Sequence, residues 1–92
     1  MSKSIIQTKK ECYYTQSTSN LHKHHVFGGA FRDLAEKYGL WIWLRADYHV
    51  GTTYAVHNNP KELKKLRILG QIAFEKLYGH EKFMKIFKKN YL

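Results

Sequence analysis

One apolar run, LWIWL at positions 40–44, constrains the fold of this chain more than any other feature. The run is rich in aromatic residues and lies between Gly39 and Arg45, which favours a short buried strand. A membrane-spanning helix needs ~20 apolar residues, many more than this run contains. The run therefore predicts a folded domain with a buried strand and no membrane partner.

Regular elements are expected on both sides of this strand. Residues 21–27 predict a short strand that ends at two glycines, and apolar residues at helical spacing predict a short helix over residues 31–38. A loop with a short helical piece is expected over residues 47–59. The expected fold class is therefore α+β, with a small two-stranded, hairpin-like sheet.

The clearest helix begins at Asn59 and Pro60, because asparagine is a good N-cap and proline suits the first helical position. Gly79 should end this helix, and residues 80–89 predict a last short helix. Leucine, isoleucine and phenylalanine side chains at helical spacing form the expected apolar face, which includes Ile72 and Leu77.

The length of 92 residues suits a single domain. Residues 1–10 are polar and basic and are expected to form a flexible N-terminal arm. Residues 11–92 are expected to form the domain, with a core over about 11–59 and supporting helices over about 60–89.

The charge balance predicts a polyanionic partner. Sixteen Lys and Arg against seven Asp and Glu give a formal net charge of +9, which attracts nucleic acid. The residues expected to contact DNA are Lys23, Arg45, Lys61, Lys64 and Lys65. A solvated helix face is the alternative interpretation of the three lysines at 61, 64 and 65.

The single cysteine, Cys12, excludes an internal disulfide, and the N-terminus lacks the apolar stretch of a signal peptide. The chain is therefore expected in the cytoplasm.

The segment NLHKHHVFGG, residues 20–29, holds three of the six histidines. Side chains alternate along a strand, so His22 and His24 should share a face while His25 takes the other. His49 and His57 would lie roughly 12 Å apart on an unbroken helix, too far to share one metal ion. A bend at residues 51–53 would bring them together.

This order of elements resembles the HNH endonucleases of the ββα-metal (His-Me finger) class, especially small phage-type members. The residues that carry the resemblance are Cys12, the HHV sequence with paired glycines, the apolar strand and the two later histidines, so it spans about residues 11–59. It implies that His24, His49 and His57 are metal ligands and that His25 is the general base. One divalent cation, Mg, Mn, Ni or Zn, is the implied cofactor.

The chain departs from the family pattern at the knuckles that hold a structural zinc in many members. Thr15 stands where the first knuckle has its second ligand, and Arg45 and Tyr48 stand at the second knuckle. One thiolate cannot hold a tetrahedral zinc, so the structural zinc is expected to be absent. The middle asparagine of the HNH name also lacks a clear counterpart.

The resemblance implies a metal-dependent DNA endonuclease that hydrolyses phosphodiester bonds. A protein partner that directs it would suit its small size, and a phage-encoded member would act in the host cytoplasm. The rival hypothesis is a catalytically silent phage protein with the same scaffold, which binds nucleic acid or inhibits a host enzyme. A third hypothesis is a basic interaction domain unrelated to HNH proteins, whose histidines need not converge.

Overall fold

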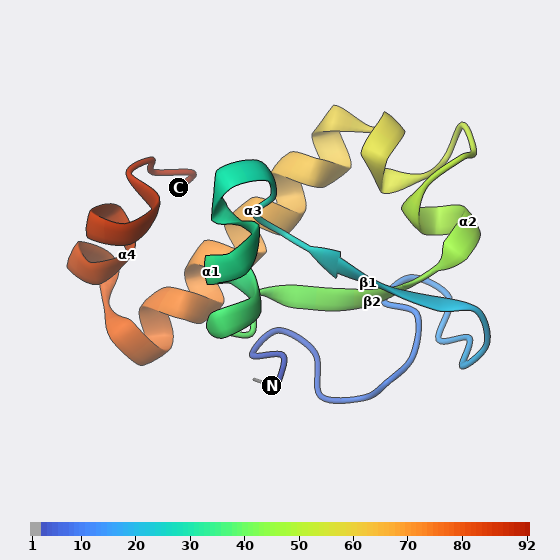
Figure 1. The fold of residues 1–92 in the computed structure, drawn as a ribbon, viewed down its shortest axis with the longest axis horizontal. Helices are drawn as coiled ribbons and strands as arrows, with labels where there is room; N and C mark the ends of the chain where they lie inside the picture. Colours follow the sequence, from blue (N-terminus) through green and yellow to red (C-terminus); the bar gives the residue numbers. More distant parts are fainter. Residues whose placement is uncertain (1–2) are drawn as a thin grey trace.

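The computed structural model describes residues 3–92 and confirms the α+β fold class. Residues 3–92 contain two strands, four α-helices and two short 3-10 helices (Figure 1). In chain order they are β1 (Leu21–His25), η1 (Gly29–Phe31), α1 (Arg32–Lys37), β2 (Trp41–Arg45), α2 (Ala46–His49), η2 (Val56–Asn58), α3 (Pro60–Tyr78) and α4 (His80–Phe87).

The two strands form one antiparallel sheet. His24 lies opposite Ile42, and Lys23 lies opposite Trp43. The expected strand over residues 21–27 is shorter than predicted, because η1 begins soon after it and leads into α1. The connection between the strands therefore contains a helix and is much longer than a hairpin turn.

One face of the sheet carries the hydrophobic core. Ile42 and Leu44 of β2 are completely buried and belong to the same core cluster as Phe74 of α3 and Phe83 of α4. Most of this core consists of side chains from β2, α3 and α4 and from the turn after β1. Tyrosine and phenylalanine rings in mutual contact extend it, which suits a chain of this length.

Helix α3 begins and ends where the sequence predicts. The Asn59 side chain accepts a hydrogen bond from the backbone N–H of Glu62, and Pro60 is the first helical residue. At the other end Gly79 has φ of +88°, a backbone conformation that L side chains rarely adopt.

The prediction of the apolar face of α3 is partly wrong. Ile72 is 43% exposed and Leu77 is 61% exposed. The helix instead packs through Gly70, where an added Cβ would lie 2.7 Å from Cγ2 of Val26. Because a glycine allows this close approach, the buried face is rotated away from Ile72 and Leu77.

The expected N-terminal arm has no helix or strand over residues 3–10, but it packs along β2 (Figure 1). The Ser4 hydroxyl donates to the Trp41 carbonyl, and the Ile5 N–H donates to the Gly39 carbonyl. The Gln7 side chain accepts from the Trp43 N–H. This segment therefore covers the outer edge of β2, which the two-stranded sheet would otherwise leave unpaired.

Within the described residues, no helix is both long enough and apolar enough to cross a membrane.

Gly39 tests the packing of the N-terminal segment. Its φ is +71°, and an added Cβ would lie 2.1 Å from the Lys3 carbonyl oxygen. We expect Gly39→Ala to lower the free energy of unfolding by more than about 2 kcal/mol, since the strain of a positive φ adds to the clash. Urea denaturation in EDTA measures this loss.

Gly51→Ala is the matched control, because Gly51 also has a positive φ but has open space around it. It should cost only the conformational strain, about 1 kcal/mol. Equal losses in the two variants would contradict the packing of residues 3–5 against Gly39.

Candidate metal centre

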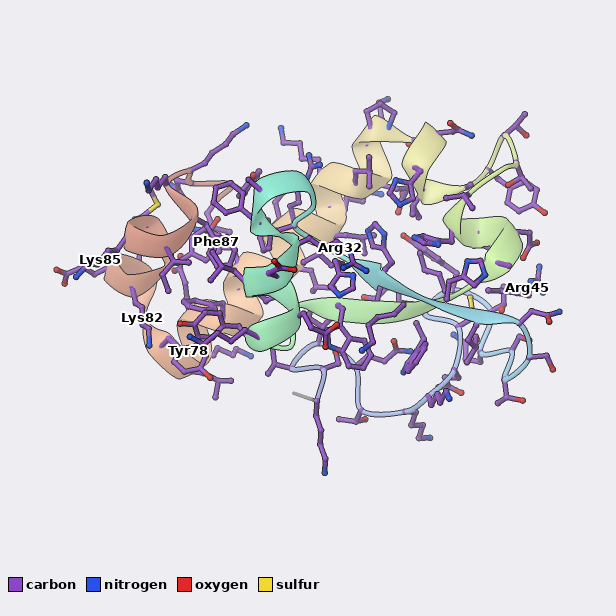
Figure 2. The ribbon with its side chains drawn as sticks, viewed as in Figure 1. Arg32, Arg45, Tyr78, Lys82, Lys85 and Phe87 are labelled. Carbon is purple, nitrogen blue, oxygen red and sulfur yellow. The ribbon has the colours of Figure 1, made fainter. Side chains whose placement is uncertain are left out.

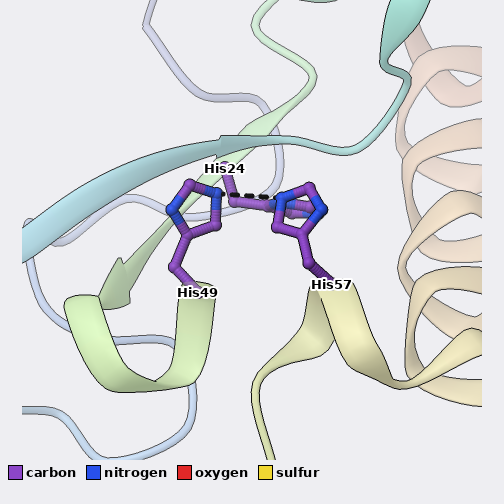
Figure 3. A group of neighbouring side chains, drawn as sticks. All are labelled: His24, His49 and His57. Atoms are coloured by element: carbon purple, nitrogen blue, oxygen red, sulfur yellow. Dashed lines mark hydrogen bonds between the residues drawn. The ribbon is translucent and has the colours of Figure 1, made fainter. Parts of the chain in front are cut away.

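Three histidines from three separate elements converge on one point. His24 lies on β1, His49 is the last residue of α2, and His57 lies in η2 (Figure 3). Each offers one ring nitrogen such that all three nitrogens lie within 4.8 Å of one another. The three residues expected to be metal ligands are therefore brought together.

The chain between His49 and His57 folds back on itself, as the glycine at position 51 predicts. Helix α2 ends at His49, and Gly51 has φ of +86°. The Thr52 hydroxyl donates to the Asp47 carbonyl at 2.6 Å, and the Asn58 amide donates to the Thr52 carbonyl at 2.8 Å. These bonds hold the turn that returns His57 to His49.

His24 is the most buried member of the group, with 2% of its surface exposed. Neither of its ring nitrogens has a hydrogen-bond partner among the described residues. Buried polar atoms without partners are rare in folded proteins, and a bound cation would satisfy one of these nitrogens. Burial, together with charge repulsion from His49 and His57, lowers the pKa of His24 to about 3. The ring is therefore neutral at pH 7, the form that binds metals.

His49 and His57 approach each other through Nε2, and the two nitrogens lie 3.1 Å apart. Two nitrogens bound to one zinc at about 2.1 Å each can be at most about 4.2 Å apart, so this pair fits a shared ion as it stands. Burial, then repulsion from His57 and His22, lowers the pKa of His49 to about 4. Both observations favour neutral imidazoles in ligand geometry.

His22 is a fourth histidine beside this group. Its Nδ1 lies 3.1 Å from Nδ1 of His49. His49 therefore presents Nε2 to His57 and holds Nδ1 against His22, which fixes the orientation of its ring. The sequence-based ligand set does not include His22, although its position on the same face as His24 was the available signal.

His25 takes the other face of β1, as the strand alternation predicts. Its Nε2 lies 2.8 Å from a carboxylate oxygen of Glu36 in α1. Lys23, on the same face, lies 3.3 Å from both oxygens of that carboxylate. The hydrogen bond from His25, followed by the interaction with Lys23, lowers the pKa of Glu36 against the opposing effect of burial. The residue expected to be the general base is thus not part of the three-histidine group.

Glu36 is a residue that the sequence analysis missed. It orients the His25 ring, the task for which the missing asparagine of the HNH pattern had no counterpart. Its position eleven residues beyond His25 gave no signal, because the contact depends on how α1 packs against β1.

The two segments that resemble knuckles, residues 12–15 and 45–48, contact each other. Tyr14 stacks on Tyr48 with ring centroids 5.8 Å apart, and the Arg45 guanidinium lies 5.2 Å from the centre of the Tyr48 ring. The Tyr14 hydroxyl also donates to Glu62 at 2.8 Å, which ties this region to α3. Packed aromatic rings thus join the knuckles to each other and to the helix.

Cys12, the single cysteine of the chain, is fully buried. Burial alone would raise the pKa of its thiol, but hydrogen bonds from the Thr15 side chain and from nearby backbone groups outweigh burial and lower it. The thiol is therefore held by polar contacts at the position that the resemblance assigns to a zinc ligand.

The residues expected to contact DNA lie on β1, β2 and the first turns of α3. Arg45 is paired with Asp47, with Nε 2.6 Å from Oδ1, and Lys65 is paired with Glu62 at 3.3 Å. Lys61 and Lys64 are exposed on the first turns of α3. Arg45 also lies at the opposite end of the molecule from the α4 lysines Lys82 and Lys85 (Figure 2). The structure does not bring these residues into the histidine group.

Comparisons with known proteins find no match to a family model, to a curated protein or to a solved structure. The resemblance to HNH endonucleases therefore rests on the residues quoted above.

The convergence of three histidines generates a direct prediction about metal binding. We expect the chain to bind one equivalent of Zn²⁺ or Co²⁺, and EDTA to remove it. His24→Leu should weaken binding by at least about 100-fold, because it removes a ligand. Isothermal titration calorimetry and the visible spectrum of the Co²⁺ form measure this.

His80→Ala is the control for this titration, since His80 is an exposed histidine on α4 that contacts Glu75. It should leave the affinity unchanged. His22→Ala should weaken binding by about 10-fold through loss of His49 orientation. Unchanged affinity in His24→Leu would contradict the proposed ligand set.

Acidification should destabilise the metal-free protein through His24. Its pKa is about 3 in the folded state, against about 6.5 in an unfolded chain, so the unfolded state binds more protons between these values. Stability is therefore full above about pH 6.5 and falls toward pH 3, with up to about 1.4 kcal/mol per pH unit from this group.

The test is urea unfolding in EDTA at pH 7, 6 and 5, a window above most carboxylate titrations. His24→Leu should flatten this dependence, whereas His80→Ala should not. The same slope in the wild-type and His24→Leu chains would overturn the assignment of a buried neutral His24.

Proposed function

We propose that this protein is a metal-dependent endonuclease of the HNH type that hydrolyses phosphodiester bonds in DNA. The observation that carries the proposal is the convergence of His24, His49 and His57, with both ring nitrogens of the buried His24 lacking hydrogen-bond partners among residues 3–92. The two antiparallel strands, followed by α2 and η2 with the other two histidines, support a ββα-metal core. The net charge of +9 supports a polyanionic substrate.

Three imidazole nitrogens fit a divalent cation that keeps a further coordination position for water or phosphate. Such a set favours zinc, nickel or manganese, because magnesium prefers oxygen ligands. When bound, the cation would stabilise negative charge on the scissile phosphate.

His25 is the proposed general base, and Glu36 is its positioning residue. When Nε2 donates its proton to the Glu36 carboxylate, the lone pair of the neutral ring is at Nδ1. This nitrogen would take the proton of the attacking water. Since β1 ends at His25, the ring lies where the chain leaves the sheet for the Gly28-Gly29 turn.

A second candidate function is a nucleic-acid-binding or enzyme-inhibiting protein that uses the same scaffold without turnover. Two observations favour it: the side chain of His25 is only 7% exposed, and it projects from the face of β1 opposite to His24. In this alternative the His25–Glu36 pair is a structural contact between β1 and α1.

Plasmid cleavage distinguishes the two functions. The purified chain should nick supercoiled DNA in one or more of Mg²⁺, Mn²⁺, Ni²⁺ and Zn²⁺, and EDTA should stop it. His25→Ala should lower the rate at least about 100-fold, since a general base contributes that much, and Glu36→Gln should lower it less. His80→Ala is the matched control and should cleave normally.

Circular dichroism shows whether each variant is folded, and the metal titration shows whether its ligands remain intact. Absence of cleavage in every metal by a folded, metal-binding chain would contradict the nuclease proposal and favour the silent alternative. Full activity of His25→Ala would contradict only the role of His25 as general base and would leave the nuclease proposal standing.

A further inference from the structure

The face of the sheet opposite the histidine group carries a groove of its own. Strand alternation directs Lys23, Trp41 and Trp43 to this face, where Lys23 and Trp43 are paired across the strands. The groove has a volume of about 640 Å³. Its lining residues are Lys3, Ser4, Gln7, Thr8, Lys10, Lys23, Trp41 and Trp43.

The floor of the groove is aromatic. Trp41 and Trp43 meet edge to face with ring centroids 5.3 Å apart, and neither ring belongs to the main hydrophobic core. Trp41 is 7% exposed, whereas Trp43 is partly open to solvent. Trp41 thus supports Trp43 from the side, and Trp43 presents a rigid indole surface in the groove.

Lysines supply all the charged side chains that line the groove. The Lys10 ammonium lies 4.9 Å from the centre of the Trp43 ring, and the Lys23 ammonium lies 4.2 Å from that of Trp41. Lys23 forms an ion pair with Glu36, whereas Lys3 and Lys10 are exposed. A positive, aromatic groove is complementary to a ligand that has both anionic groups and flat rings.

The wall of the groove is held in place by the sheet. Ser4 is bonded to the Trp41 carbonyl, and Gln7 accepts from the Trp43 N–H at 2.8 Å. The Gln7 amide also donates to the Glu11 carbonyl. The bonds to Trp41 and Trp43 engage backbone groups of the floor itself, so the groove is formed before any ligand arrives and binding requires little additional ordering.

We propose that this groove binds a single-stranded segment of nucleic acid, with one base stacked on Trp43 and the adjoining phosphates on Lys3 and Lys10. An unpaired strand fits better than a duplex, because only unpaired bases expose their flat faces to an aromatic ring. The base displaces the Lys10 ammonium from above the indole, and that ammonium then pairs with a phosphate.

The groove also leads toward the proposed general base. Glu36 contacts both Lys23, which lines the groove, and His25. The idea that the groove delivers a strand to His25 rests on the proposed nuclease function. The idea that the groove binds a strand does not depend on that function.

The chain itself provides the reporter, because its two tryptophans both line the groove. The experiment is a titration of the full chain, in EDTA, with a single-stranded oligothymidylate of about twelve nucleotides and with the matching duplex. The single strand should quench tryptophan fluorescence and bind more tightly than the duplex. Added salt should weaken binding, because lysine contacts release counterions.

Anisotropy of a labelled oligonucleotide then compares folded variants. Trp43→Leu should weaken binding by about 5- to 100-fold, in line with one stacked base, and Trp43→Phe should restore most of the affinity. Lys10→Gln should weaken binding and reduce its salt dependence. Lys85→Gln is the control, because Lys85 is an exposed lysine on α4. This variant should lose only the small affinity that any distant positive charge contributes.

Three results would overturn the proposal: no quenching by the single strand, equal affinity for duplex and single strand, or equal effects of Lys10→Gln and Lys85→Gln. Quenching by an acidic peptide but not by the oligonucleotide would also overturn it and assign the groove to a protein partner. Because the titration excludes metal and measures no cleavage, strand binding by a chain that nicks no plasmid would contradict the nuclease function alone.

Discussion

The register of β1 against β2 is the constraint on which the other features depend. With His24 opposite Ile42, the side chain of His24 faces His49 of α2 and His57 of η2. Lys23 and His25 point to the other face, where both contact Glu36 of α1 and Lys23 lines the groove beside the N-terminal segment. A slip of one residue would exchange the two faces, placing His25 toward the helices and Lys23 in the core. The same register therefore builds the histidine group on one side and the tryptophan groove on the other.

The histidine group is consistent with burial of neutral rings. His24 is enclosed, and His49 and His57 contact it at ring-centroid distances of 5.4 and 5.1 Å. Protonation of any two of these rings would place like charges close together in a poorly solvated site. Burial thus keeps His24 and His49 neutral at neutral pH, so that their lone pairs can bind a cation. The group found among the described residues consists of histidines alone.

Features that depend on local chemistry could be predicted from the sequence. Asn59 fixes the start of α3 through its own side chain, and Gly51 permits the bend that reunites His49 with His57. The sharing of a face by His22 and His24 follows from alternation alone. Local rules suffice for these features because each involves residues on one element or one turn.

The remaining features depend on how separate elements pack. Glu36 meets His25 only because α1 lies against β1, and the spacing of eleven residues between them carries no signal of that contact. The exposure of Ile72 follows from the close approach of Val26 to Gly70, which rotates the buried face of α3. Helical periodicity identifies an amphipathic helix but cannot show which side a glycine opens to a neighbour.

The central claim is that His24, His49 and His57 bind the same ion, and X-ray absorption spectroscopy of the zinc-loaded protein tests it most directly. The account predicts three imidazole nitrogens at about 2.0 Å, with the multiple-scattering pattern of histidine rings and a further light-atom ligand. In His24→Leu this count should fall to two or the ion should be lost. A first shell of oxygens, or a spectrum that His24→Leu leaves unchanged, would contradict the account.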